Sequence, residues 1–141
     1  MTSNPACCTA DASLKEAARL MADHDCGEIP VVDDSGRPVG VVTDRDIACR
    51  GMAQGKAADA PVSEVMSSPA VTVTPETSLD DCCNTLEDNQ IRRVPVVDES
   101  GSCCGMVSQA DIARNASEHD TAQVGRDVSR PTEESSRAGC C

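Results

Sequence analysis

The feature that most constrains the fold of this chain is an internal repeat with a period of 65 residues. The segment Pro-Val-Val-Asp that begins at Pro30 aligns with the same four residues beginning at Pro95. Over positions 27–48, eleven of the 22 residues are identical to their partners, and no gap is needed. Such a repeat indicates two copies of one supersecondary unit, each too small to close a core alone.

Each copy predicts the same order of elements: helix, strand, strand, helix. Ser13 and Ser78 are candidate N-caps, because a serine hydroxyl can accept a hydrogen bond from a free first-turn N–H group. Apolar residues behind each serine recur at the spacing of an amphipathic helix. A second helix is expected to begin near Asp44 and near Gln109. Polar Ser-Gly turns predict hairpins between short apolar runs, which span residues 29–32 and 39–42 in the first copy and 94–97 and 104–107 in the second.

This order predicts a mixed α/β (α+β) fold with three segments. The first copy and its connection span residues 4–60, and the second copy spans 61–115, where residues 71–73 add a short leading strand. Polar residues dominate the tail, 116–141, which we expect to be partly helical or disordered.

Composition restricts the function classes. The formal net charge of −12 over 141 residues opposes non-specific nucleic-acid binding. There is no Phe, Tyr or Trp on which a base could stack. No apolar run reaches the roughly 18 residues of a membrane span, and residues 1–5 are unlike a secretory signal. We therefore expect a cytoplasmic protein that contacts neither nucleic acid nor a membrane.

A second motif follows each hairpin. The sequence Gly-Val-Val-Thr-Asp-Arg-Asp begins at Gly40, and Gly-Met-Val-Ser-Gln-Ala-Asp begins at Gly105. With the Pro-Val-Val-Asp strands, these motifs make the chain resemble a tandem pair of CBS domains, a Bateman module, over roughly residues 4–114. It looks most like small stand-alone bacterial CBS-pair proteins.

This resemblance implies two small sheets packed about a pseudo-twofold axis, with two clefts between the repeats. In the family these clefts often hold adenosine-containing ligands such as AMP, ADP, ATP or S-adenosylmethionine. Many such modules form homodimers. A stand-alone pair would act as a ligand sensor for a protein partner that the sequence does not identify.

Several residues are candidates to hold such a ligand. The resemblance assigns the ribose contact to Asp46 and Asp111, since a carboxylate can accept hydrogen bonds from two adjacent hydroxyls. The hydroxyls of Thr43 and Ser108 precede two helices and either face a phosphate or simply cap the helix. The resemblance places the adenine against an apolar slot that, by position, would be formed by Ile29, Val94, Ser67 and Ala70, although Ile29 and Val94 are equally consistent with the core.

A phosphate in so acidic a protein would need cations, and Arg45, Arg92 and Arg93 are the candidates. Each is equally well explained as a solvated surface charge. Position 110 is Ala where the first copy has Arg45, and position 28 is Glu where the second copy has Arg93. We therefore expect the two clefts to bind ligands unequally.

The ten cysteines support a structural interpretation. Five of them occupy positions where the other copy has Ile, Val or Ala, and free cysteine packs as a small hydrophobe. The sequence has no Cys-x-x-Cys pair, and we assign no residue as a metal ligand. A zinc alternative would have to draw on His24 and Cys26, together with Cys140 and Cys141.

No catalytic constellation is present, so we expect no enzyme and no obligatory cofactor. The leading hypothesis is a sensor that binds an adenosine-type ligand between the repeats. The alternative is a zinc-binding or scaffolding stress protein whose nucleotide clefts stay empty.

Overall fold

The computed structural model describes residues 1–115, and residues 116–141, including the predicted tail, lie outside the described part. Its elements, in chain order, are β1 (Thr2–Ser3), β2 (Cys8–Thr9), α1 (Leu14–His24), β3 (Glu28–Val32), β4 (Pro38–Thr43), α2 (Asp44–Asp46), the π-helix η1 (Ile47–Gly51), the 3-10 helices η2 (Met52–Gln54) and η3 (Val62–Glu64), α3 (Leu79–Asn89), β5 (Arg93–Val97), β6 (Cys103–Ser108) and α4 (Gln109–Asn115).

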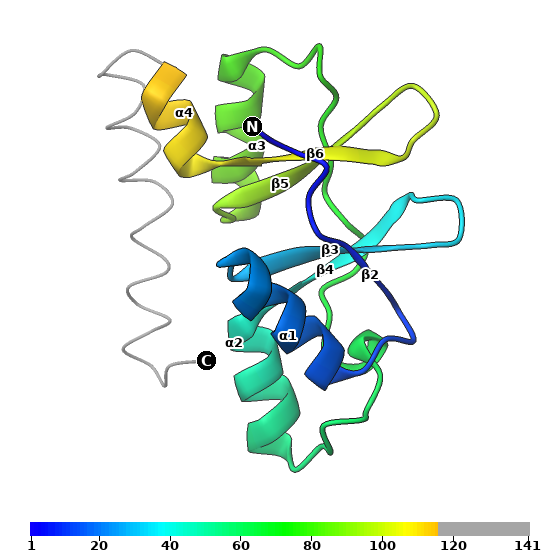
Figure 1. Cartoon of the computed structure of the whole chain (residues 1–141). Helices are drawn as coiled ribbons and strands as arrows, with labels where there is room; N and C mark the ends of the chain where they lie inside the picture. The colour runs from blue at the N-terminus through cyan, green and yellow to red at the C-terminus, as the bar shows by residue number, and fades with distance from the viewer. Residues whose placement is uncertain (116–141) are drawn as a thin grey trace.

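The elements form two similar halves that meet through their hairpins (Figure 1). One sheet has the strand order β2-β3-β4 and the other has the order β1-β6-β5. The hairpins β3–β4 and β5–β6 lie beside each other at the middle of the molecule, with the helices of each half on the outer sides. The mixed fold class and the two small sheets are confirmed.

The predicted helices begin at their predicted caps. The Ser13 hydroxyl accepts from the Glu16 N–H group at 3.0 Å, and the Ser78 hydroxyl accepts from the Asp81 N–H group at 3.1 Å. Each hydroxyl satisfies one of the N–H groups that an isolated helix end leaves unpaired. The second helices begin at Asp44 and Gln109, as predicted.

The two hairpins repeat each other in detail. Both carry a register shift, between Val31 and Val32 in the first and between Val96 and Val97 in the second. Their turns also touch: the Ser102 hydroxyl donates to the Ser35 carbonyl at 3.0 Å. The hairpin loops therefore fasten the halves together at one end.

The segment that leads into each half crosses from one sheet to the other. Thr2 pairs with Met106 of β6, and 65 residues later Ser67 pairs with Val41 of β4. Beyond these points the chain passes to the sheet of its own half, where Cys8 pairs with Val31; the equivalent bridge joins Val73 to Val96. Residues 71–73 thus form a single bridge rather than the predicted strand. Each half therefore contributes backbone to the other half's sheet.

Each half has its own apolar core. The first surrounds Leu14, Ile29 and Val42, and the second surrounds Leu86, Val94 and Ile112. The first core also contains Val62 and Val65, although the predicted boundary at residue 61 places them in the second copy. Their place in the core shows that the connection folds back onto the first half, so residue 61 does not mark where one core ends.

The five cysteines at aliphatic positions do belong to the cores. Cys8 packs in the first core, and Cys82 and Cys83 pack in the second. Cys26 and Cys104 are half-buried and pack against the first and second core respectively. The prediction that these cysteines fill space as small hydrophobes is confirmed.

Candidate ligand-binding cleft

The strand-to-helix junction after each hairpin holds its motif residues in one reciprocal arrangement. The Thr43 hydroxyl accepts from the Asp46 N–H group, and the Asp46 carboxylate accepts from the Thr43 N–H group, both at 3.0 Å. In the second half, the Ser108 hydroxyl accepts from Asp111 N–H at 3.2 Å, and the Asp111 carboxylate accepts from Ser108 N–H at 2.9 Å. Both pairs form a capping box, so the capping interpretation of the hydroxyls is correct.

Capping does not use the whole Asp111 carboxylate. Its Oδ2 atom accepts the Ser108 bonds, while its Oδ1 atom pairs with the Arg114 guanidinium and lies 3.6 Å from the Met1 amino group. Burial raises the pKa of the Asp111 carboxyl, but the Ser108 hydrogen bonds and the two cations outweigh burial, so its pKa is lowered. The carboxylate is therefore charged at neutral pH, and only 7% of the residue is exposed.

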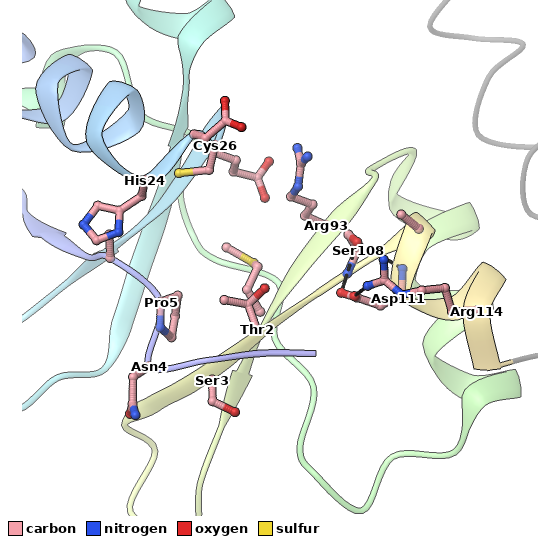
Figure 2. Close-up of a pocket in the computed structure, with 15 residues that line it drawn as sticks. Thr2, Ser3, Asn4, Pro5, His24, Cys26, Arg93, Ser108, Asp111 and Arg114 are labelled. Carbon is pink, nitrogen blue, oxygen red and sulfur yellow. Dashed lines mark hydrogen bonds and ion pairs between the residues drawn. The ribbon is translucent and has the colours of Figure 1, made fainter.

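Asp111 lies at a cleft between the halves with a volume of about 460 Å³. Of the predicted site residues, Arg93, Ser108 and Asp111 line this cleft. Figure 2 shows His24 and Cys26 on one side of the cleft, Ser108, Asp111 and Arg114 on the other, and Arg93 between them. The volume lies within the range of small-molecule sites, about 300–1,000 Å³.

Residues 2–6 form another wall of this cleft, and the sequence analysis missed them. They stand 65 positions before residues 67–71, the segment that contains the predicted contacts Ser67 and Ala70. The repeat itself is the signal that would have found them, because a predicted contact in one copy implies its partner in the other. At the exact offset of 65, Ser3 and Ser68 are the only identical pair between these two segments, so the match is inconspicuous.

The other predicted contacts do not line this cleft. Thr43, Arg45 and Asp46 lie at the junction of β4 and α2, and Ser67 pairs with β4 in that half. Asp46 approaches Arg50, whose Nε atom is 3.8 Å from the carboxylate, and the Nη2 atom of Arg45 is buried without a hydrogen-bond partner.

Ala70 follows Ser67 on the same leading segment. Ile29 and Val94 are 0% exposed within their cores, which agrees with the core alternative and not with a wall of this cleft. Arg92 is exposed and is likewise absent from the cleft lining.

Glu28 is a cleft residue that sequence reasoning did not select. It begins β3 opposite Thr43, lines the cleft, and has its Oε2 atom buried without a hydrogen-bond partner. Burial is the largest cause that raises the pKa of Glu28, the Arg93 charge lowers it, and the charges of Asp46 and Asp44 raise it, so that the pKa is raised to about 7. Its partner in the repeat is Arg93, so the two halves place opposite charges at equivalent positions.

His24 and Cys26 also line the cleft, which allows the zinc alternative to be tested against the geometry. Within residues 1–115, no group of three or more His, Cys, Asp or Glu side chains is placed to hold a metal ion. Since structural zinc needs four ligands and catalytic zinc at least three, the described residues do not fit a zinc ion. Cys140 and Cys141, the other predicted ligands, lie outside the described part.

Comparison with known proteins places this architecture in a family. The model of the CBS domain matches residues 1–50 and 62–118, once for each repeat. The chain belongs to the CBS-domain family. It is 42% identical to CBS domain-containing protein YhcV of Bacillus subtilis over 122 residues, which is 86% of each chain. It is 34% identical to Hypoxic response protein 1 of Mycobacterium tuberculosis, covering 93% of this chain and 92% of the relative.

Solved structures show the same fold. Hypoxic Response Protein I with two coordinated zinc ions superposes with a TM-score of 0.76 at 35% identity, covering 83% of this chain and 95% of that one. The CBS domain pair of protein MJ0100, in complex with 5-methylthioadenosine and S-adenosyl-L-methionine, gives a TM-score of 0.73 at 29% identity, covering 82% and 90%. CBSX2 in complex with AMP gives 0.71 at 27% identity, also covering 82% and 90%.

No helix in the described part of the chain is long and apolar enough to cross a membrane.

Proposed function

We propose that this protein is a regulatory ligand sensor that binds an adenosine-containing small molecule in the cleft at Asp111. The observation that carries the proposal is the buried, charged Asp111 carboxylate on a cleft of about 460 Å³ between the two halves. A buried carboxylate is well suited to accept hydrogen bonds from a pair of ribose hydroxyls, because charge-assisted bonds are the stronger ones.

The leading segment supplies the second support for this proposal. Residues 2–6 give backbone groups and small side chains on the wall beside Asp111. The chain has no Phe, Tyr or Trp, so an adenine in this cleft would be held without stacking on those rings. Structural relatives with bound AMP, or with 5-methylthioadenosine and S-adenosyl-L-methionine, support the same class of ligand.

Binding would change the relation between the halves, because the cleft walls come from both of them. A ligand that prefers one arrangement shifts the population toward it, and a partner protein would sense that shift. Homodimer formation and a cytoplasmic location belong to the same proposal, and light scattering of the purified protein tests the first. Zinc is left out of it, since the described residues do not fit the ion.

Calorimetric titration with adenosine, AMP, ATP and S-adenosylmethionine tests the proposal. We expect at least one of them to bind, and Asp111→Asn to weaken that binding about tenfold or more, since a hydrogen bond to a charged group contributes about 1.5–3 kcal/mol. Asp88→Asn, an exposed change on α3, is the matched control and should bind as the unchanged protein does.

A second variant separates binding from folding, because Asp111 also caps α4. Ser3→Trp places a large side chain on the cleft wall from an exposed strand, and it should abolish binding while the circular dichroism spectrum is unchanged. Absence of binding for all four compounds, or full binding in both variants, contradicts the proposal.

A further inference from the structure

We infer that Glu28 makes the Asp111 cleft select adenosine ligands by the charge of their 5′ substituent, so that a cationic or uncharged substituent is accepted and a phosphate is disfavoured. This inference rests on the proposed function and adds to it the chemical class of the ligand.

Glu28 has a buried carboxylate oxygen that no protein group satisfies. Its side chain lies at the head of β3 on the cleft wall, and its Oε2 atom is buried with no hydrogen-bond partner. Among residues 1–115, no ion pair within 4.0 Å includes Glu28. A buried carboxylate without a partner carries a desolvation penalty, which a cation or a hydrogen-bond donor on the ligand would reduce.

The cationic side chains that line the cleft are exposed to solvent. The Arg114 side chain is 69% exposed and already pairs with Asp111. Arg93 and His24 are also exposed. The Asp111 charge is paired with Arg114 and with the Met1 amino group, whereas the half-buried Glu28 has no ion pair. Water and salt screen the exposed charges of Arg93 and His24 more strongly, so Glu28 leaves negative charge in the cleft that no ion pair compensates.

The two repeated motifs differ in charge at one position. In the first half, the cation Arg45 stands between Thr43 and Asp46. The equivalent residue beside Asp111 is Ala110, which lines the cleft and has no charge. Position 110 therefore lacks the cation that position 45 has, although Arg114 pairs with Asp111. Asp44 and Asp46 add negative charge near Glu28.

Three adenosines that differ only at the 5′ position test this inference: 5′-amino-5′-deoxyadenosine, adenosine and AMP. Near neutral pH the amine is cationic and the phosphate is anionic. We expect the amine to bind about tenfold or more tightly than AMP, with adenosine between them, which corresponds to about 1.4 kcal/mol. Calorimetric titration of the full chain measures the three affinities.

Two variants then assign the selectivity to these residues. Glu28→Gln keeps the size of the side chain and removes its charge, so it should reduce the preference for the amine over AMP about tenfold. Ala110→Arg, at an exposed position, should change the preference in the same direction by strengthening AMP binding. Glu99→Gln, in the exposed turn of the second hairpin, is the control and should leave the preference unchanged.

The outcomes separate the two proposals. If none of the three compounds binds, the proposed function fails, and the inference with it. If the compounds bind with equal affinity, or AMP binds most tightly, the sensor function stands and charge selection by Glu28 is wrong. A preference for the amine that persists unchanged in Glu28→Gln also overturns the inference.

Discussion

At the scale of single residues, Glu28 and Arg93 show how a near-symmetric repeat can carry an asymmetric site. They occupy equivalent positions at the heads of β3 and β5, yet one is a half-buried acid and the other an exposed base. The fold provides two similar strand-to-helix junctions, and single side chains set the charge near each of them. A difference in charge between the two junctions therefore needs no change of backbone.

The raised pKa of Glu28 has a measurable effect on stability. Its pKa is about 7 in the folded protein against 4.5 for a free glutamate side chain, so between these values the folded state holds a proton that the unfolded state has lost. Stability contributed by this group is therefore present below pH 4.5 and is lost as pH rises toward 7, by up to about 3 kcal/mol.

Glu28→Gln removes this titration. The variant should match the unchanged protein at pH 4.5 and exceed its free energy of unfolding by about 1–3 kcal/mol at pH 8. Urea unfolding followed by circular dichroism measures both values. Equal stability at pH 8 would show that the folded protein does not penalise the Glu28 charge.

The residue roles that the sequence predicts correctly are those that depend on neighbours a few positions away in the chain. Ser13 and Ser78 cap helices because each hydroxyl accepts a hydrogen bond from an N–H group three residues later. A spacing this short can be recognised in the sequence. Glu28 could not be assigned in this way, since a polar residue at the head of an apolar strand ordinarily meets water. Its partial burial arises from tertiary packing around the cleft, which its own segment does not encode.

At the scale of elements, the strands and helices follow from the repeat. Because the pattern occurs twice, it predicts one hairpin in each half. The observed strands are only one or two residues longer than the predicted apolar runs. The leading strand β1 was not predicted, because two polar residues show no alternation. It exists through its pairing with β6, about 100 residues away in the sequence.

Close approach of the leading segments explains the glycine in each second strand. A Cβ atom at Gly40 would lie 2.6 Å from the Ser67 carbonyl oxygen, whereas at Gly105 the nearest atom is the Met1 sulfur, also at 2.6 Å. A backbone oxygen held in a β-bridge has little freedom to move, but the end of a methionine side chain can change its rotamer.

Gly40→Ala should therefore destabilise the protein by about 1–3 kcal/mol, and Gly105→Ala should cost distinctly less. Chemical unfolding of the two variants under identical conditions measures the difference. If both substitutions cost the same, backbone crowding by the leading segment does not account for Gly40.

At the scale of the whole molecule, two separate cores are joined by exchanged backbone. Ser67 adds to the first sheet and Thr2 adds to the second, while the hairpin turns meet at Ser102 and Ser35. Neither half keeps its complete sheet without the other. We therefore expect one cooperative unfolding transition, despite the two separate cores.

Buried thiols can report on both cores at once, in a chain that has no aromatic fluorescence. Cys8 belongs to the first core and Cys83 to the second. Labelling across a urea gradient, read by mass spectrometry of peptides, should give the same midpoint for both. Leu86→Ala, a loss of about 2–5 kcal/mol in the second core, should shift both midpoints equally.

Independent midpoints for Cys8 and Cys83 would contradict this prediction and show two separable units. The exposed substitution Asp88→Asn serves as the control, because a surface change away from special features usually alters stability by no more than about 0.5 kcal/mol.

The exchanged leading segments also impose an order on folding during synthesis. We expect Ser67 to pair with β4 soon after the first hairpin is synthesised, whereas β1 must wait for β6, the last strand within residues 1–115. Contacts that span so much chain form late, because closing a long loop costs more entropy. Since residues 2–6 are a wall of the cleft, we expect the cleft to be completed only after β6 has been made.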